Sequence, residues 1–212
     1  MSETAVALTD YALVAESSAL AVWLARVAPP SRERSLWLGF YAATAVAALT
    51  GGTVHGFFTA APSLIGSALW IVTMLAIGVT GVTVLALAGE IGWPGPVARK
   101  LALLGLVELV GYAAVVIGVT QAYWLALAQY APFGALWLAV LARAWWRRRE
   151  RADLLGLIGL ALSFVAAGVQ FFGVAIPAVG LDHNSLYHVI QAAGLWLLFR
   201  CAVGRLVPSR GA

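Results

Sequence analysis

Long apolar segments alternate with short polar ones along the whole chain. Seven apolar segments can be marked, at residues 6–27, 36–58, 64–88, 101–119, 122–141, 154–176 and 186–203. A helix of about 20 apolar residues crosses the ~30 Å hydrocarbon core of a bilayer. The pattern therefore predicts seven transmembrane helices, which form a single all-α domain over residues 1–212.

Proline and charged residues separate most of these segments. The first segment is followed by "APPSRERS", the third by "GWPGPVARK" and the fifth by "RAWWRRRERAD". Proline has no amide hydrogen to donate and ends helices. The connections "TAAPS" and "GVTQA" are short and uncharged, so the helix ends beside them are less sharply defined. Tryptophan is typical of the membrane interface, and it stands at the expected helix ends as Trp37, Trp93, Trp124, Trp145 and Trp146.

Composition supports an integral membrane protein and excludes an ordinary soluble domain. Hydrophobic residues make up 62% of the chain and charged residues 10%, against roughly 45–50% and 25% in soluble domains. The single cysteine, Cys201, leaves no internal disulfide and no thiolate zinc cluster. The first segment carries Glu3, Asp10 and Glu16 and no early basic residue, which differs from a cleaved signal peptide. We expect a permanent helix there.

The basic residues predict the orientation in the membrane, because cytoplasmic loops hold the excess of Lys and Arg. With the N-terminus outside, all thirteen basic residues fall at inner helix ends, namely Arg26, Arg32, Arg34, Arg99, Lys100, Arg143, Arg147, Arg148, Arg149, Arg151, Arg200, Arg205 and Arg210. The sequence therefore predicts an outside N-terminus and a cytoplasmic C-terminus in a multi-pass protein of a bacterial inner (plasma) membrane. The net charge of +4 then reflects contact with anionic membrane lipid, and no nucleic-acid partner is expected.

Four ionisable side chains are expected in the outer half of the bundle. Such groups cost on the order of 2.5–3.5 kcal/mol each near the bilayer centre, so each needs a partner or a purpose. At about 1.5 Å per residue, Asp10 lies ~6 Å and Glu16 ~15 Å below the outer boundary, and His55 and His188 lie within ~5 Å of it. Their common depth predicts a shared site.

Helix periodicity sorts the polar residues of the seventh segment by face. Asn184, His188 and Gln191 follow the spacing i, i+4, i+7 and form one stripe. Asp182 and His183 precede that stripe and are expected at the mouth of the site, where Asp182 is one of the residues suited to cap the helix.

The first two segments add a polar face and a close approach. Asp10 and Ser17 share one face of the first helix, whereas Glu16 points about 100° away from Ser17. Gly52 and Gly56 flank His55 in a spacing that lets a neighbouring helix approach closely. This spacing suits a tightly packed site and equally suits plain helix packing.

Two imidazoles and nearby carboxylates are ligands that zinc prefers. A catalytic zinc has three protein ligands and one water, whose pKa falls to about 7. His55 and His188 are the candidate metal ligands, and the third ligand stays open among Glu16, Asp10, His183 and Asn184. The alternative is a metal-free, hydrogen-bonded polar core.

The chain resembles the seven-helix membrane hydrolase superfamily that includes alkaline ceramidases and the progestin and adipoQ receptors. His55 in "GGTVHGFF" matches the second-helix histidine of that superfamily, and His188 in "HNSLYHVIQ" matches the second histidine of its seventh-helix HxxxH pair. The segment "ALVAESSAL" around Glu16 is similar to an acidic first-helix segment of the ceramidases. The resemblance covers the whole chain and implies zinc and hydrolysis of a lipid bond.

Three positions depart from the motifs of that superfamily. Asn184 stands at the first position of the HxxxH pair, Gly51 stands where the superfamily has a serine, and the third segment has no aspartate. The chain therefore also fits an uncharacterised bacterial family that keeps the scaffold with a remodelled site.

Two functions from different classes follow. The first is a membrane-embedded zinc-dependent hydrolase of a lipid amide or ester, with His55 and His188 as ligands and Glu16 or Asp10 as third ligand or base. The second is a non-enzymatic binder, sensor or transporter of a lipid or small molecule, with the same residues as a polar core. A retinal protein is excluded, because it needs a Schiff-base lysine and Lys100, at an inner helix end, is the only lysine.

Overall fold

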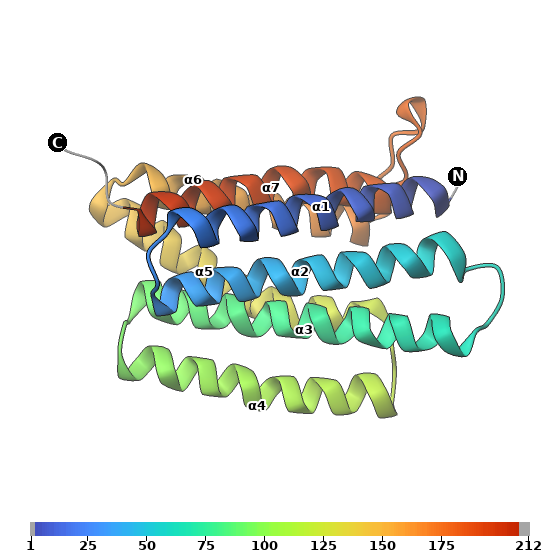
Figure 1. Cartoon of the computed structure of the whole chain (residues 1–212), viewed down its shortest axis with the longest axis horizontal. Helices are drawn as coiled ribbons and strands as arrows, with labels where there is room; N and C mark the ends of the chain where they lie inside the picture. Colours follow the sequence, from blue (N-terminus) through green and yellow to red (C-terminus); the bar gives the residue numbers. More distant parts are fainter. Residues whose placement is uncertain (1–2, 208–212) are drawn as a thin grey trace.

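The computed structural model describes residues 3–207, which form seven long α-helices and one 3-10 turn (Figure 1). The elements are α1 (Glu3–Val27), α2 (Arg32–Phe57), α3 (Leu64–Gly92), α4 (Pro96–Gly118), α5 (Tyr123–Arg148), α6 (Arg151–Phe171), η1 (Pro177–Val179) and α7 (His183–Leu206). All seven α-helices are long and apolar enough to cross a membrane. The chain is thus an all-helical multi-pass membrane protein, and the predicted number of helices is confirmed.

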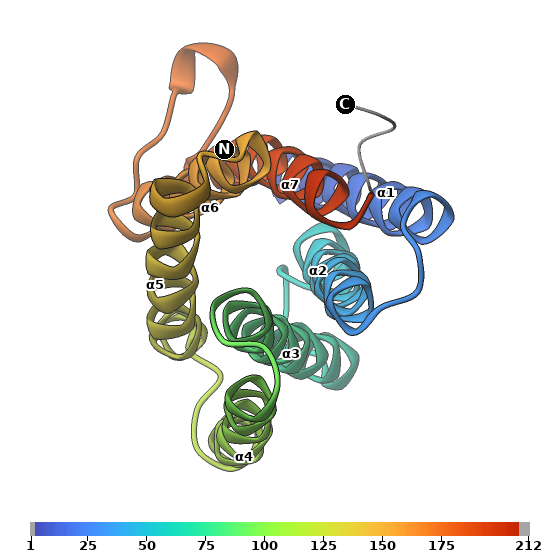
Figure 2. The same ribbon diagram turned by 90° about the vertical axis from the view of Figure 1, so that its left-hand side faces the viewer.

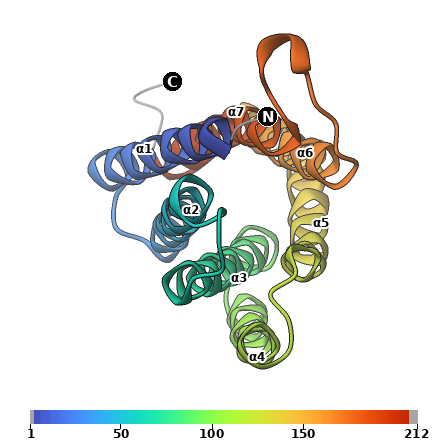
Figure 3. The same ribbon diagram turned by 90° about the vertical axis from the view of Figure 1, so that its right-hand side faces the viewer.

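Six of the helices form a closed ring, and α4 lies outside it. Neighbours around the ring are α1, α2, α3, α5, α6 and α7, and α7 packs against α1 to close it. The end-on views in Figures 2 and 3 show α4 against the outer side of α3. The interior of the bundle is therefore enclosed by six helices, and α4 adds nothing to its wall.

Several helix bounds differ from those predicted by apolarity. The predicted helix 154–176 is wrong at its C-terminal end, because α6 ends at Phe171 and Gly173 adopts a positive φ of 66°. The following apolar residues form a loop with exposed side chains, which hydropathy does not distinguish from a helix. Conversely, α5 continues beyond the predicted residue 141 to Arg148, since arginine is a good helix former.

An aromatic cluster fills the core of the ring. It consists of Trp37, Phe40 and Tyr41 from α2 and Trp137 from α5, each at most 1% exposed. The rings of Trp37 and Trp137 lie 5.2 Å apart between centroids, and the Tyr41 hydroxyl donates to the carbonyl of Leu195 in α7 at 3.1 Å. The prediction of Trp37 as an interface residue is wrong, because its helix begins earlier, at Arg32, and Trp37 faces the ring interior.

An ionic network ties four helices together at the end of the bundle opposite the start of α1. Asp153 of α6, 1% exposed, accepts from Arg148 of α5 at 2.9 Å and from Arg205 of α7 at 2.8 Å. Arg205 also contacts Glu33 of α2 at 2.7 Å. Some of the basic residues that predict orientation therefore also hold the helix ends together.

Candidate functional site

A cavity of about 420 Å³ lies inside the ring of six helices. Its lining runs from Phe40 in the interior to His55 near the end of α2, a rise of roughly 22 Å along the helix. Side chains of α1, α2, α3, α5, α6 and α7 line it, and none comes from α4. Phe40 belongs to the aromatic cluster, so that cluster closes the deep end of the cavity.

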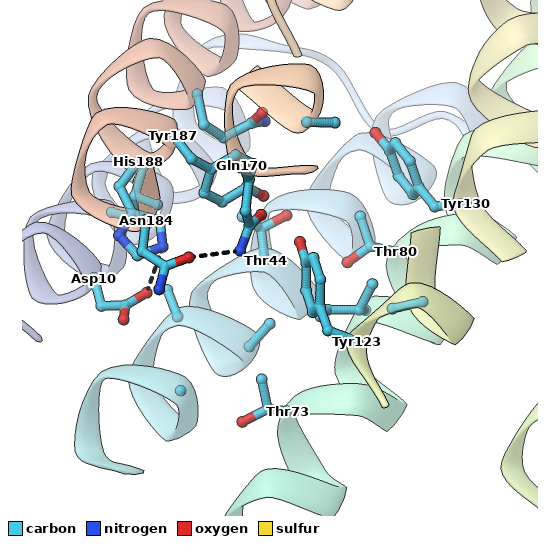
Figure 4. A pocket seen from close by; sticks show the side chains of 18 of the residues that line it. Asp10, Thr44, Thr73, Thr80, Tyr123, Tyr130, Gln170, Asn184, Tyr187 and His188 are labelled. Carbon is cyan, nitrogen blue, oxygen red and sulfur yellow. Dashed lines mark hydrogen bonds and ion pairs between the residues drawn. The ribbon is translucent and has the colours of Figure 1, made fainter. Parts of the chain in front are cut away.

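Asp10 and His188 form a buried pair at one wall of this cavity (Figure 4). His188 Nε2 lies 3.2 Å from Asp10 Oδ1, and His188 Nδ1 lies 2.8 Å from the Thr9 hydroxyl. Asp10 is 5% and His188 8% exposed. The pair joins α1 to α7, where the ring closes.

The contacts of the Thr9 hydroxyl fit two proton arrangements of this pair. Besides His188 it lies 3.0 Å from the carbonyl of Ala5 and 2.9 Å from that of Val6, and it has a single proton to donate. When Thr9 donates to Nδ1, neutral His188 donates Nε2–H to an ionised Asp10. When Thr9 donates to the backbone, Nδ1 carries a proton and the pair holds one proton more. The two arrangements differ by one unit of charge.

Glycine residues in α2 allow Asp10 to pack closely against that helix. A Cβ atom at Gly52 would lie 2.7 Å from the Cβ of Asp10, and one at Gly56 would lie 3.4 Å from the Cβ of Ala7. The spacing of these two glycines therefore serves the contact between α1 and α2 at the level of Asp10.

Asp182 fixes the start of α7 and with it the residues of the first turn. Its Oδ1 accepts from the Ser185 amide at 2.8 Å, and its own amide donates to the Ser185 hydroxyl at 3.0 Å. Although partial burial raises the pKa of Asp182, these hydrogen bonds with Ser185 hold it below its usual value. In the same turn, Asn184 accepts from Gln170 of α6 at 2.9 Å.

The structure brings together most, but not all, of the residues singled out in the sequence. Those that line the cavity are Asp10, His55, His183, Asn184, His188 and Gln191. Glu16 is half-buried, Ser17 is buried and Asp182 is the helix cap, and none of the three lines the cavity. Six residues correspond to about 240° around a helix, so Glu16 points away from the site that Asp10 faces.

His55 lies at the edge of the site and has its own partner. Its Nδ1 is 3.0 Å from a carboxylate oxygen of Glu3, and its ring lies edge-on to Trp70 at 6.3 Å. His55 and His188 therefore line one cavity, each paired with a different carboxylate of α1.

Several lining residues escaped the sequence analysis because they are amphipathic and common in membrane helices. They are Trp70 and Thr73 of α3, Tyr123 and Tyr130 of α5, Gln170 of α6 and Tyr187 of α7. Among them, Gln170 could have been found from the sequence, because a side-chain amide inside an apolar segment needs a hydrogen-bond partner. Thr9 gave no signal, since a threonine can bond its own helix backbone.

The side chains expected to hold zinc are placed in hydrogen-bonded pairs. Zinc ligation uses a free ring nitrogen of histidine, whereas both nitrogens of His188 lie within hydrogen-bonding distance of protein atoms. Within residues 3–207, no group of three or more His, Cys, Asp or Glu side chains is arranged to hold a metal ion. In this arrangement the residues do not form a zinc site. Zinc binding therefore stays a prediction from the sequence.

Comparison with known proteins gives a family match. The sequence matches the family DUF6962, described as a family of unknown function, over residues 5–206. No curated protein and no solved structure matches the chain.

The substitution Gly52→Ala tests the close packing of Asp10. The added Cβ meets the Cβ of Asp10 at 2.7 Å, and such overpacking typically costs about 1–3 kcal/mol. We expect a lower melting temperature in detergent. The matched control is Gly111→Ala on the exposed face of α4, where no atom lies within 4 Å of the added Cβ and the melting temperature should hold or rise. Equal melting temperatures for the two variants would contradict the packing described.

Proposed function

The chain belongs to DUF6962, a family of unknown function, and we propose that it binds a small amphipathic molecule in the cavity inside its six-helix ring. The observation that carries this proposal is the cavity of about 420 Å³, which falls in the range of roughly 300–1,000 Å³ typical of small-molecule sites. It is enclosed by six membrane-crossing helices. A binder, sensor or transporter of a lipid or small molecule fits this arrangement.

The character of the cavity wall supports an amphipathic ligand. Apolar side chains such as Leu13, Ile77 and Leu127 line it. Polar groups gather where α1 and α7 meet, among them the pair of Asp10 and His188. Binding sites for small molecules typically combine a mostly apolar wall with a few placed polar groups.

Substitutions at two alanines of α2 test this function. Ala47 lines the cavity, so Ala47→Leu places a larger side chain in it, whereas the exposed Ala42 is outside the lining. Native mass spectrometry of protein purified from membranes should show a small-molecule adduct on the wild type and on Ala42→Leu. On Ala47→Leu the bound fraction should fall about tenfold or more. An adduct unaffected by Ala47→Leu, or no adduct on any of the three proteins, would count against the proposal.

We further propose that the N-terminus lies outside a bacterial plasma membrane, so that the cavity is near the outer face. The clustering of basic residues between α1 and α2, α3 and α4, and α5 and α6 supports this orientation. Single cysteines at Ala61 and Glu150, both exposed and in connections at opposite ends, test it in a Cys201→Ser background. A membrane-impermeant maleimide should label Ala61→Cys on intact cells and Glu150→Cys only after lysis. The reverse pattern would invert the proposed orientation.

A zinc-dependent hydrolase of a lipid amide or ester is the second candidate. The observation in its favour is the buried carboxylate and imidazole of Asp10 and His188 beside the cavity, a combination that general acid–base chemistry uses. Elemental analysis of purified protein decides this point. A hydrolase requires about one zinc per chain that disappears in the double variant His55→Ala, His188→Ala. The proposed binding function predicts zinc well below one per chain in both proteins.

A further inference from the structure

Among the described residues that line the cavity one has a carboxylate, and we propose that the ligand is a singly charged organic cation, an amine whose ammonium group binds Asp10 and whose apolar part packs against aromatic rings. This inference rests on the proposed function, since it names the chemical class of the molecule in the same cavity. It concerns the charge of the ligand, which cavity size and apolarity leave open.

The charge balance of the lining residues favours a cation. Within the described part of the chain, Asp10 is the only acidic residue of the lining, and the lining includes no lysine or arginine. The remaining groups that can carry a positive charge are His55, His183 and His188. With neutral imidazoles and an ionised Asp10, the arrangement in which His188 donates Nε2–H to it, the lining carries one negative charge, which a monovalent cation neutralises and an anion does not.

Asp10 has an acceptor that the protein leaves unused. Oδ1 pairs with His188 at 3.2 Å, whereas Oδ2 is buried and has no hydrogen-bond partner among the described residues. An ionised carboxylate oxygen without a donor is costly in a low-dielectric interior. An ammonium group supplies both the donor and the opposite charge. The close contact with α2 at Gly52 holds the Cβ atom of Asp10 beside the cavity that this residue lines.

Aromatic rings complete a site of this kind. Five of them line the cavity, from Phe40, Trp70, Tyr123, Tyr130 and Tyr187. Tyr123 and Tyr130 lie across the cavity from Asp10 and His188 in Figure 4. Ring faces attract cations, most strongly where water is excluded, and they also pack against the apolar part of an amine. The carboxylate on one side of the cavity thus matches the ammonium group of an amphipathic amine, and the rings on the other side match its apolar part.

Three probes of matched shape test the charge of the ligand. They are 2-phenylethylammonium, the neutral 2-phenylethanol and the anionic phenylacetate. Binding is measured by calorimetry on the full chain in lipid nanodiscs, with empty nanodiscs as the blank for partition into lipid. We expect the ammonium to bind at least ten times more tightly than the alcohol, and the carboxylate not to bind.

The substitution Asp10→Asn assigns this preference to one residue. In this variant the affinity for 2-phenylethylammonium should fall to the value that the wild type has for 2-phenylethanol. The affinity for 2-phenylethanol itself should not change, and this unchanged binding shows that the variant is folded. The matched control Glu150→Gln removes an exposed carboxylate at the opposite end of the bundle and should behave as the wild type. If Asp10→Asn does not fold, the three probes on the wild-type protein still decide the sign of the charge.

The possible results separate this inference from the proposed function. Equal affinity for alcohol and ammonium, or an ammonium preference that survives in Asp10→Asn, overturns the inference. If both affinities are then lost in Ala47→Leu, the cavity still binds small molecules and the proposed function stands. If Ala47→Leu leaves the binding of the probes unchanged, or if none of the probes binds to the wild type, the inference and the proposed function both lose support.

Discussion

A polar group inside a membrane needs a partner within the protein, and the structure is organised by this requirement. Hydrocarbon offers no hydrogen bonds, so an unsatisfied polar group there costs several kcal/mol. The described helices meet the requirement with pairs that cross between neighbours. Asp10 reaches His188, Gln170 reaches Asn184, and Gln129 of α5 donates to Glu108 of α4 at 3.0 Å. The first two pairs help to hold the ring together, and the third ties α4 to it. Asp10 Oδ2 is one of several buried polar atoms that have no partner among the described residues, and the proposed ligand chemistry rests on this one.

The bundle is divided along its axis into three layers with different tasks. The cavity occupies the half in which α1 and α7 begin. Below it the cluster of Trp37, Phe40, Tyr41 and Trp137 fills the interior. Beyond that cluster the network centred on Asp153 and Arg205 joins the helix ends. Two packed layers therefore separate the cavity from the far end, which suits a site that exchanges its ligand on one side of the membrane.

Sequence periodicity predicted the parts of this structure that depend on local pattern. The seven helices follow from hydropathy, and the stripe of Asn184, His188 and Gln191 lines the cavity because residues four and seven apart share a helix face. The same periodicity separates Glu16 from Asp10. The order of helices around the ring did not follow from sequence, because α4 is as apolar as its neighbours and only packing places it outside. A single sequence does not show which face of an apolar helix contacts protein and which contacts lipid. For this reason the sequence did not predict that Trp37 faces the interior or that tyrosines line the cavity.

The central claim is that a cation binds beside Asp10 inside the six-helix ring, and locating a heavy-atom analogue tests it most directly. A crystal structure with 2-(4-bromophenyl)ethylammonium, grown in a lipid phase, reveals the bromine by its anomalous signal. The claim predicts one bromine position within the ring, with the ammonium nitrogen about 3 Å from the carboxylate of Asp10 and no such peak in crystals of Asp10→Asn. A bromine found only on the lipid-facing surface, or an unchanged peak in Asp10→Asn, would contradict it.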